Sequence, residues 1–150
     1  MGSVFHYRFD QVMTIKEQEK NESEMAYKES VSDFEKIATD LFEALKKKED
    51  LIIFQQERMS TGLSILEMHN YANFIDSIEK KIAELQQKVI QARSKMEWFE
   101  AKLLEISLEC KKYEKMKEKE QTLFNLEQDR IEVIQLDEMS QIAFYNKEVR

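Results

Sequence analysis

The strongest constraint on this chain is a stripe of apolar residues that recurs at alternating four- and three-residue spacing through residues 71–113. A mean spacing of 3.5 residues keeps one seam of a helix facing a partner helix as the two wind around each other. The pattern therefore predicts a long helix that buries a narrow seam and leaves its other faces in water. The thirteen seam positions are Tyr71, Ile75, Ile78, Ile82, Leu85, Val89, Ala92, Met96, Phe99, Leu103, Ile106, Cys110 and Tyr113.

Helix-breaking residues are almost absent from the 150-residue sequence, which has no proline and only one internal glycine, Gly62. Glycine readily takes the left-handed conformation that ends a helix, and Ser64 followed by Glu67 forms a capping-box pattern. We therefore expect helices over about residues 10–60 and 65–145, joined by a turn at about 61–64. A break this short predicts an all-α fold, a single-domain, long antiparallel two-helix coiled-coil hairpin.

The first predicted helix carries a matching stripe, and Asp10 is placed to cap its start. In the hairpin, the numbers of facing residues should add to about 125 to 127, so that Leu45 meets Ile82 and Met59 meets Met68. The a positions are Val31, Ala38, Leu45, Ile52 and Met59, and the d positions are Tyr27, Phe34, Leu41, Lys48 and Gln55.

The seam weakens in the C-terminal part of the chain. Lys117 and Glu120 occupy seam positions, and apolar residues return only at Phe124, Ile131 and Ile134. We expect a tail after about residue 120 that is helical, less well packed, and ordered by a partner.

Composition excludes several classes of function. The formal net charge of −7 argues against nucleic-acid binding, which needs a basic field. No apolar stretch approaches the ~20 residues of a membrane-spanning helix, so we expect no direct membrane insertion and a soluble, cytoplasmic protein. His6 and His69 match no metal-ligand spacing, and a two-helix rod has no cleft in which carboxylates could act as catalysts. We therefore predict no catalytic residue, no cofactor and no metal, and a buried, unreactive Cys110 on the seam.

Two groups of residues lie off the seam and are candidates for partner contact. Large apolar residues gather near the hairpin end. Phe54 is hard to bury between two helices, which favours contact with a partner, and Leu51 is placed either to cover the seam or to meet a partner. A lysine-rich run at residues 111–119 forms either a solvated face or a docking site for an acidic partner. Trp98 is a further off-seam hydrophobic candidate. The apolar group is Leu51, Ile53, Phe54, Ile65, Leu66 and Phe74, and the lysines of the run are Lys111, Lys112, Lys115, Lys117 and Lys119.

Two segments match the pattern of a known family. The opening Phe5-His6-Tyr7-Arg8-Phe9-Asp10-Gln11-Val12 and the stretch Asn70-Tyr71-Ala72-Asn73-Phe74-Ile75-Asp76-Ser77-Ile78 follow its motifs, the second reading N-Y-x-x-F-I with Ile78 in place of the usual leucine. On these residues the sequence resembles the flagellar export protein FliJ family of Gram-positive bacteria over nearly its whole length.

The resemblance implies a non-enzymatic component of the flagellar type III protein export apparatus, needed for flagellum biogenesis and motility. Family members are stalk-like coiled coils that promote assembly and activity of the hexameric export ATPase and also contact the export gate membrane protein and export chaperones. Such a protein is cytoplasmic and peripherally associated with the membrane-bound apparatus.

The resemblance also assigns roles to residues. Phe74 and Ile78 match family positions that contact the gate, and Leu51 and Phe54 align more loosely with the same surface. Lys111, Lys112 and Lys115 are assigned to the ATPase end. Two alternatives stay open: the equivalent stalk of a virulence-type secretion system, and a structural coiled-coil scaffold that associates with itself.

Overall fold

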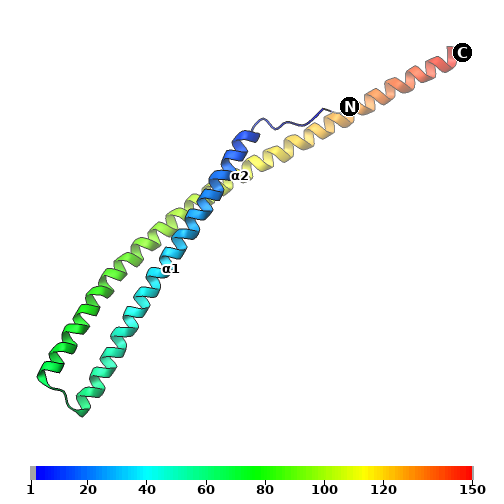
Figure 1. Ribbon diagram of the computed structural model, residues 1–150. Coiled ribbons are helices and arrows are strands. Elements are labelled where there is room, and N and C mark those ends of the chain that lie inside the picture. The colour runs from blue at the N-terminus through cyan, green and yellow to red at the C-terminus, as the bar shows by residue number, and fades with distance from the viewer. Residues whose placement is uncertain (1–2, 150) are drawn as a thin grey trace. The chain divides into compact units, whose positions relative to one another are not determined.

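The computed structural model describes residues 3–149, which form two long α-helices and no strand (Figure 1). Helix α1 spans Asp10–Thr61 and α2 spans Ile65–Val149. The two helices pack against each other, so the predicted all-α helical hairpin is confirmed. The chain divides into two compact units, residues 22–104 (the hairpin unit) and residues 3–21 with 105–149 (the terminal unit). The single-domain organisation stays a prediction.

The turn between the helices contains the two signals that the sequence supplies. Gly62 has a φ of 103°, a left-handed conformation that an L side chain would strain. The Ser64 hydroxyl accepts a hydrogen bond from the Glu67 backbone N–H at 3.2 Å, so Ser64 caps α2. The Glu67 carboxylate lies 3.7 Å from Arg58, which ties the end of α1 to the start of α2.

The predicted seam of α2 is the buried face of this helix in the hairpin unit. Between Tyr71 and Leu103 every seam position is buried or half-buried, and every other residue is exposed. Four buried residues form the core of the unit, and Leu41 and Leu51 pack against them. The core residues are Ala44, Ile78, Ile82 and Leu85.

Contacts between the helices confirm the predicted register. The Lys48 ammonium lies 3.2 Å from the Glu79 carboxylate, and these residue numbers add to 127. The rings of Phe54 and Tyr71 lie 5.8 Å apart between centroids, and their numbers add to 125. Both sums fall within the range expected for an antiparallel hairpin with a turn at Gly62.

The assignment of a positions on α1 was wrong at Leu45 and Met59, whereas Val31, Ala38 and Ile52 are half-buried as expected. Leu45 is 44% exposed and Met59 is 51% exposed, whereas Ala44 is 8% and Ser30 is 2% exposed. The α2 side of the core already supplies three large aliphatic side chains, so a small residue opposite them fills the seam without overpacking. The buried Ser30 hydroxyl is satisfied because it donates to the Tyr27 carbonyl at 2.6 Å.

The start of α1 also differs from the prediction. The first helical hydrogen bond runs from the Met13 N–H to the Phe9 carbonyl at 2.8 Å, so Phe9 occupies the N-cap position. Asp10 is the first helical residue, where its charge complements the helix dipole. Its carboxylate is not used as a cap and instead lies 3.2 Å from the Lys117 ammonium.

Cys110 is 1% exposed, which confirms the prediction of a buried thiol on the seam of the terminal unit. Burial raises the pKa of this thiol because the thiolate would lose its hydration, and three nearby glutamates act in the same direction against Lys20. The thiol is therefore held in its unreactive, protonated form.

Candidate functional site

The hairpin end carries an exposed aromatic surface, which we call the hairpin-end surface and define by Leu51, Phe54, Tyr71 and Phe74. Phe54 is 48% exposed and Phe74 is 52% exposed, from opposite helices. A hollow of about 380 Å³ opens beside Phe74, Tyr71 and Leu51. The Lys47 ammonium lies 5.7 Å from the centroid of the Phe74 ring, a cation–π distance at the rim of this surface.

The four residues assigned to gate contact have different environments. Phe54 and Phe74 are available to a partner, whereas Ile78 is only 7% exposed and belongs to the core. Leu51 is half-buried and packs against that core, so it covers the seam and also lines the hollow. A substitution at Ile78 would therefore act through packing before it could act on a partner.

More apolar surface lies close to the turn. Ile53, Ile65 and Leu66 are 47%, 87% and 69% exposed. Two helices can cover only one stripe on each other, so these side chains have no place in the seam. The surplus predicted from the sequence is thus exposed at the hairpin end, a property typical of interaction sites.

Lys111, Lys112 and Lys115 are all exposed in the terminal unit. Within residues 3–149 none of them lies within ion-pair distance of a carboxylate. Their role in partner contact stays a prediction.

Sequence reasoning missed an aromatic strap that precedes α1. Residues 3–9 are not helical, yet Tyr7 is only 6% exposed and its hydroxyl donates to the Tyr113 carbonyl at 3.2 Å. Phe5 contacts Phe124 at 5.4 Å between ring centroids, and Phe9 contacts Tyr113 at 6.1 Å. The alternation of Phe5, Tyr7 and Phe9 is the signal that could have revealed it, because every second residue of an extended segment shares one face.

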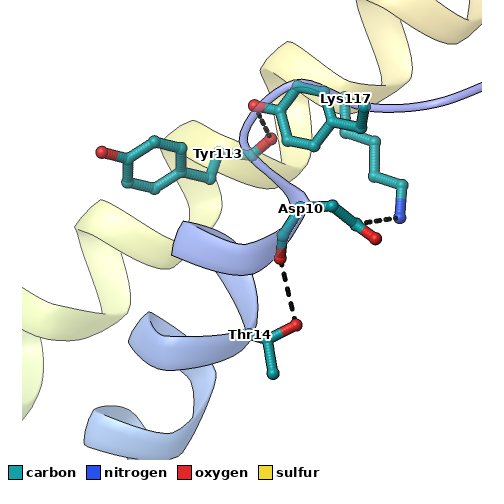
Figure 2. A network of polar contacts seen from close by, with 5 residues as sticks. Asp10, Thr14, Tyr113 and Lys117 are labelled. Atoms are coloured by element: carbon teal, nitrogen blue, oxygen red, sulfur yellow. Dashed lines mark hydrogen bonds and ion pairs between the residues drawn. The ribbon is translucent and has the colours of Figure 1, made fainter.

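Figure 2 shows polar contacts at the junction of the strap, the start of α1 and α2. The Asp10 carboxylate meets Lys117, and the Thr14 hydroxyl donates to the Asp10 carbonyl at 3.0 Å. Burial is the largest cause of the raised pKa of the Tyr7 hydroxyl, followed by the charge of Glu120. The strap thus replaces α1 as the cover of α2 near Tyr113.

Beyond the strap, α2 continues as one helix to Val149 (Figure 1). Every residue from 129 to 149, which we call the tail, is exposed. At 100° per residue, Ile131, Ile134 and Ile142 continue the seam, while Val133 and Phe144 lie on the opposite face. Apolar residues on opposite faces are typical of a helix that is surrounded by protein.

No metal-binding cluster of three or more His, Cys, Asp or Glu residues occurs among residues 3–149, and His6 and His69 are exposed. Neither helix, over the described residues, has a stretch long and apolar enough to span a membrane.

Comparison with known proteins identifies the family. The model of the family described as "Flagellar FliJ protein" matches residues 5–149. The Flagellar FliJ protein of Bacillus subtilis (strain 168) is 35% identical over 137 residues, covering 91% of this chain and 93% of the relative. No solved structure matches the chain at a significant level.

The geometry defines a class of protein, a two-helix hairpin that presents apolar surface near the turn and along a single-helix tail. Within that class, the chain belongs to the flagellar FliJ family. The family resemblance noted from the residues is therefore confirmed, and membership supports a component of the flagellar export apparatus.

Proposed function

We propose that this chain is the stalk of the flagellar type III export apparatus and acts without catalysing a reaction. In this proposal the end with the strap and tail engages the hexameric export ATPase and promotes its assembly and activity. The hairpin-end surface contacts the export gate membrane protein, and the body also meets export chaperones. The protein would work in the cytoplasm, peripherally associated with the membrane-bound apparatus.

The observation that carries the proposal is the tail. It is a continuous helix, exposed at every residue from 129 to 149, with apolar side chains on opposite faces. A single partner helix would cover one face only, whereas the pore of a ring surrounds a helix on all sides. A stalk in such a pore changes the ATPase by binding some ring states more tightly than others.

The first experiment measures hydrolysis and hexamer formation by the purified export ATPase with and without this chain. We expect stimulated hydrolysis and more hexamer. The double variant Ile131→Ser, Ile142→Ser should lose most of the stimulation while keeping its helical circular dichroism, because both side chains are exposed. Unchanged stimulation by this variant would contradict the role of the tail.

The second experiment tests the hairpin-end surface with the soluble part of the gate protein. Phe54→Ala and Phe74→Ala should each weaken binding about tenfold and leave ATPase stimulation unchanged. Phe42→Ala is the matched control, because Phe42 is a phenylalanine of the same unit and is 65% exposed. If Phe54→Ala and Phe74→Ala bind the gate protein as tightly as the control Phe42→Ala and the parent do, this surface is not the gate contact.

The family favours a flagellar stalk over the virulence-type alternative. The scaffold alternative predicts self-association with no effect on the ATPase, and the first experiment separates the two.

A further inference from the structure

One flank of α2 in the hairpin unit carries a lysine at every seventh residue. Because seven residues make nearly two helical turns, these side chains form a row along the edge of the seam. The flank on the other side of the seam carries Glu79, Gln86, Arg93 and Glu100 and has no such excess of positive charge. The lysine row is Lys81, Lys88, Lys95 and Lys102.

The seam is hollowed along this flank, and the hollows follow from the small residues in the core. A hollow of about 350 Å³ opens over Ala44, with Lys81 in its wall. A second hollow, of about 330 Å³, opens over Ser30 and Ala92.

The second hollow, which we call the lysine hollow, has both basic and apolar lining residues. Lys36, Lys88 and Lys95 line it with a single carboxylate, Asp33, and Ile37 adds an apolar side chain. Among residues 3–149, no carboxylate lies within ion-pair distance of any of these three lysines. The hollow therefore suits an apolar side chain flanked by acids.

The tail has this chemistry. Residues 129–149 contain five acidic and two basic side chains. Asp129, Val133, Asp137 and Phe144 follow each other at spacings of four, four and seven residues, so they share one face. That face alternates carboxylates with apolar groups, and both its apolar side chains are exposed.

The tail belongs to the terminal unit and the lysine hollow to the hairpin unit. Two tails would pair poorly with each other, because each carries a net negative charge and like charges repel.

We propose that the tail of a second copy of this chain docks in the lysine hollow, with its acidic face against Lys36, Lys88 and Lys95. This inference goes beyond the proposed function, because it does not depend on the ATPase or the gate. A tail held in this way is withdrawn from any other partner, so self-association would compete with ATPase binding. A single helix face buries only about 600 Å² in total, below the size of a stable interface, so the association is weak and weakens further in salt.

Sedimentation of the full chain over micromolar to submillimolar concentrations tests the proposal. We expect reversible association with a dissociation constant in the micromolar range. Two double variants should each weaken this association at least tenfold. They are the hollow variant Lys88→Glu, Lys95→Glu and the tail variant Asp129→Lys, Asp137→Lys. An equimolar mixture of the two variants should associate again, because the reversed tail then meets the reversed hollow.

Arg93→Glu is the matched control, since it reverses a basic residue of the same helix on the other flank. It should associate as the parent does. A parent chain that stays monomeric at all concentrations, an equal loss in Arg93→Glu, or no recovery in the mixture would each overturn the proposal. None of these outcomes bears on ATPase stimulation, so the two proposals fail independently.

Discussion

The hairpin unit and the terminal unit use the same seam of α2 in different ways. In residues 22–104, α1 covers the seam, and four hydrophobic residues and Ser30 are buried. In the terminal unit, Cys110 of α2 and Tyr7 of the strap are buried, and every residue of the tail is exposed. The stripe weakens at Lys117 and Glu120 but returns at Ile131 and Ile134, which are nevertheless exposed, so the stripe alone does not ensure burial.

The two units are suited to different kinds of contact with a partner. Packed helices give a rigid body on which exposed groups such as Phe54 and Phe74 are held in place. An uncovered helix of about 20 residues is only marginally stable in isolation, because most helical stability in proteins comes from packing. The hairpin unit is therefore suited to presenting a surface, and the tail to becoming ordered on one.

The largest difference in stability between the two units is expected when isoleucine is replaced by alanine in each of them. Ile82→Ala should lower the free energy of unfolding by about 2–4 kcal/mol, because it leaves a cavity in the core. Ile142→Ala should change it by less than about 0.5 kcal/mol, because Ile142 is 61% exposed. Urea titrations followed by circular dichroism measure both. A large cost at Ile142 would mean that the tail is packed in the free protein.

Cys110→Ser tests whether the terminal unit has a true buried anchor. We expect a loss of about 1–2 kcal/mol in the free energy of unfolding, because a hydroxyl replaces a buried thiol. Cys110→Ala, which adds no polar group, should cost less. Equal stability of the parent and both variants would show that this part of the seam is open.

The same thiol predicts a pH effect. Its pKa is raised by folding, so the protonated form stabilises the folded state, and this stabilisation is lost as pH rises above the ordinary thiol value of about 8.5. Native protein should react with a thiol reagent far more slowly than protein in urea at the same alkaline pH. Equal rates would contradict burial of Cys110.

Tyr7→Phe tests the strap without changing its aromatic packing. The variant loses the hydrogen bond to the Tyr113 carbonyl, so the strap should detach more often and trypsin should cleave after Arg8 several-fold faster. Tyr27→Phe, a change in the hairpin unit, is the matched control and should leave that rate unchanged. If both variants are cleaved at the parent rate, the hydroxyl does not hold the strap.

The smallest expected effect is at the ion pair of Lys48 and Glu79. Both side chains are partly exposed, so Glu79→Gln should cost less than about 0.5 kcal/mol, and that cost should vanish in high salt. Asp76→Asn removes a pair within α2 and is the control for loss of a surface charge. A cost above 1 kcal/mol at Glu79 only would mean that this pair, and not the apolar seam, sets the register.

Much of the fold was predictable because it follows from local rules. The thirteen-residue stripe, the single internal glycine and the Ser64 cap predict two helices, a turn and a register, and contacts such as Lys48 with Glu79 agree with that register. The aromatic surplus at the hairpin end was predictable for the same reason, because residues off a 3.5-residue stripe cannot enter a two-helix seam.

The sequence by itself thus determined the all-α hairpin, the seam of α2 and the exposure of Phe54 and Phe74. Only the tertiary structure decided which of two neighbouring α1 residues enters the seam, as with Ala44 in place of Leu45, because that choice depends on the volume supplied by the facing helix. It also decided that the strap covers α2 near Tyr113 and that lysines border hollows over small seam residues. These features depend on how residues far apart in the sequence fit together, and no periodicity along one segment contains that information.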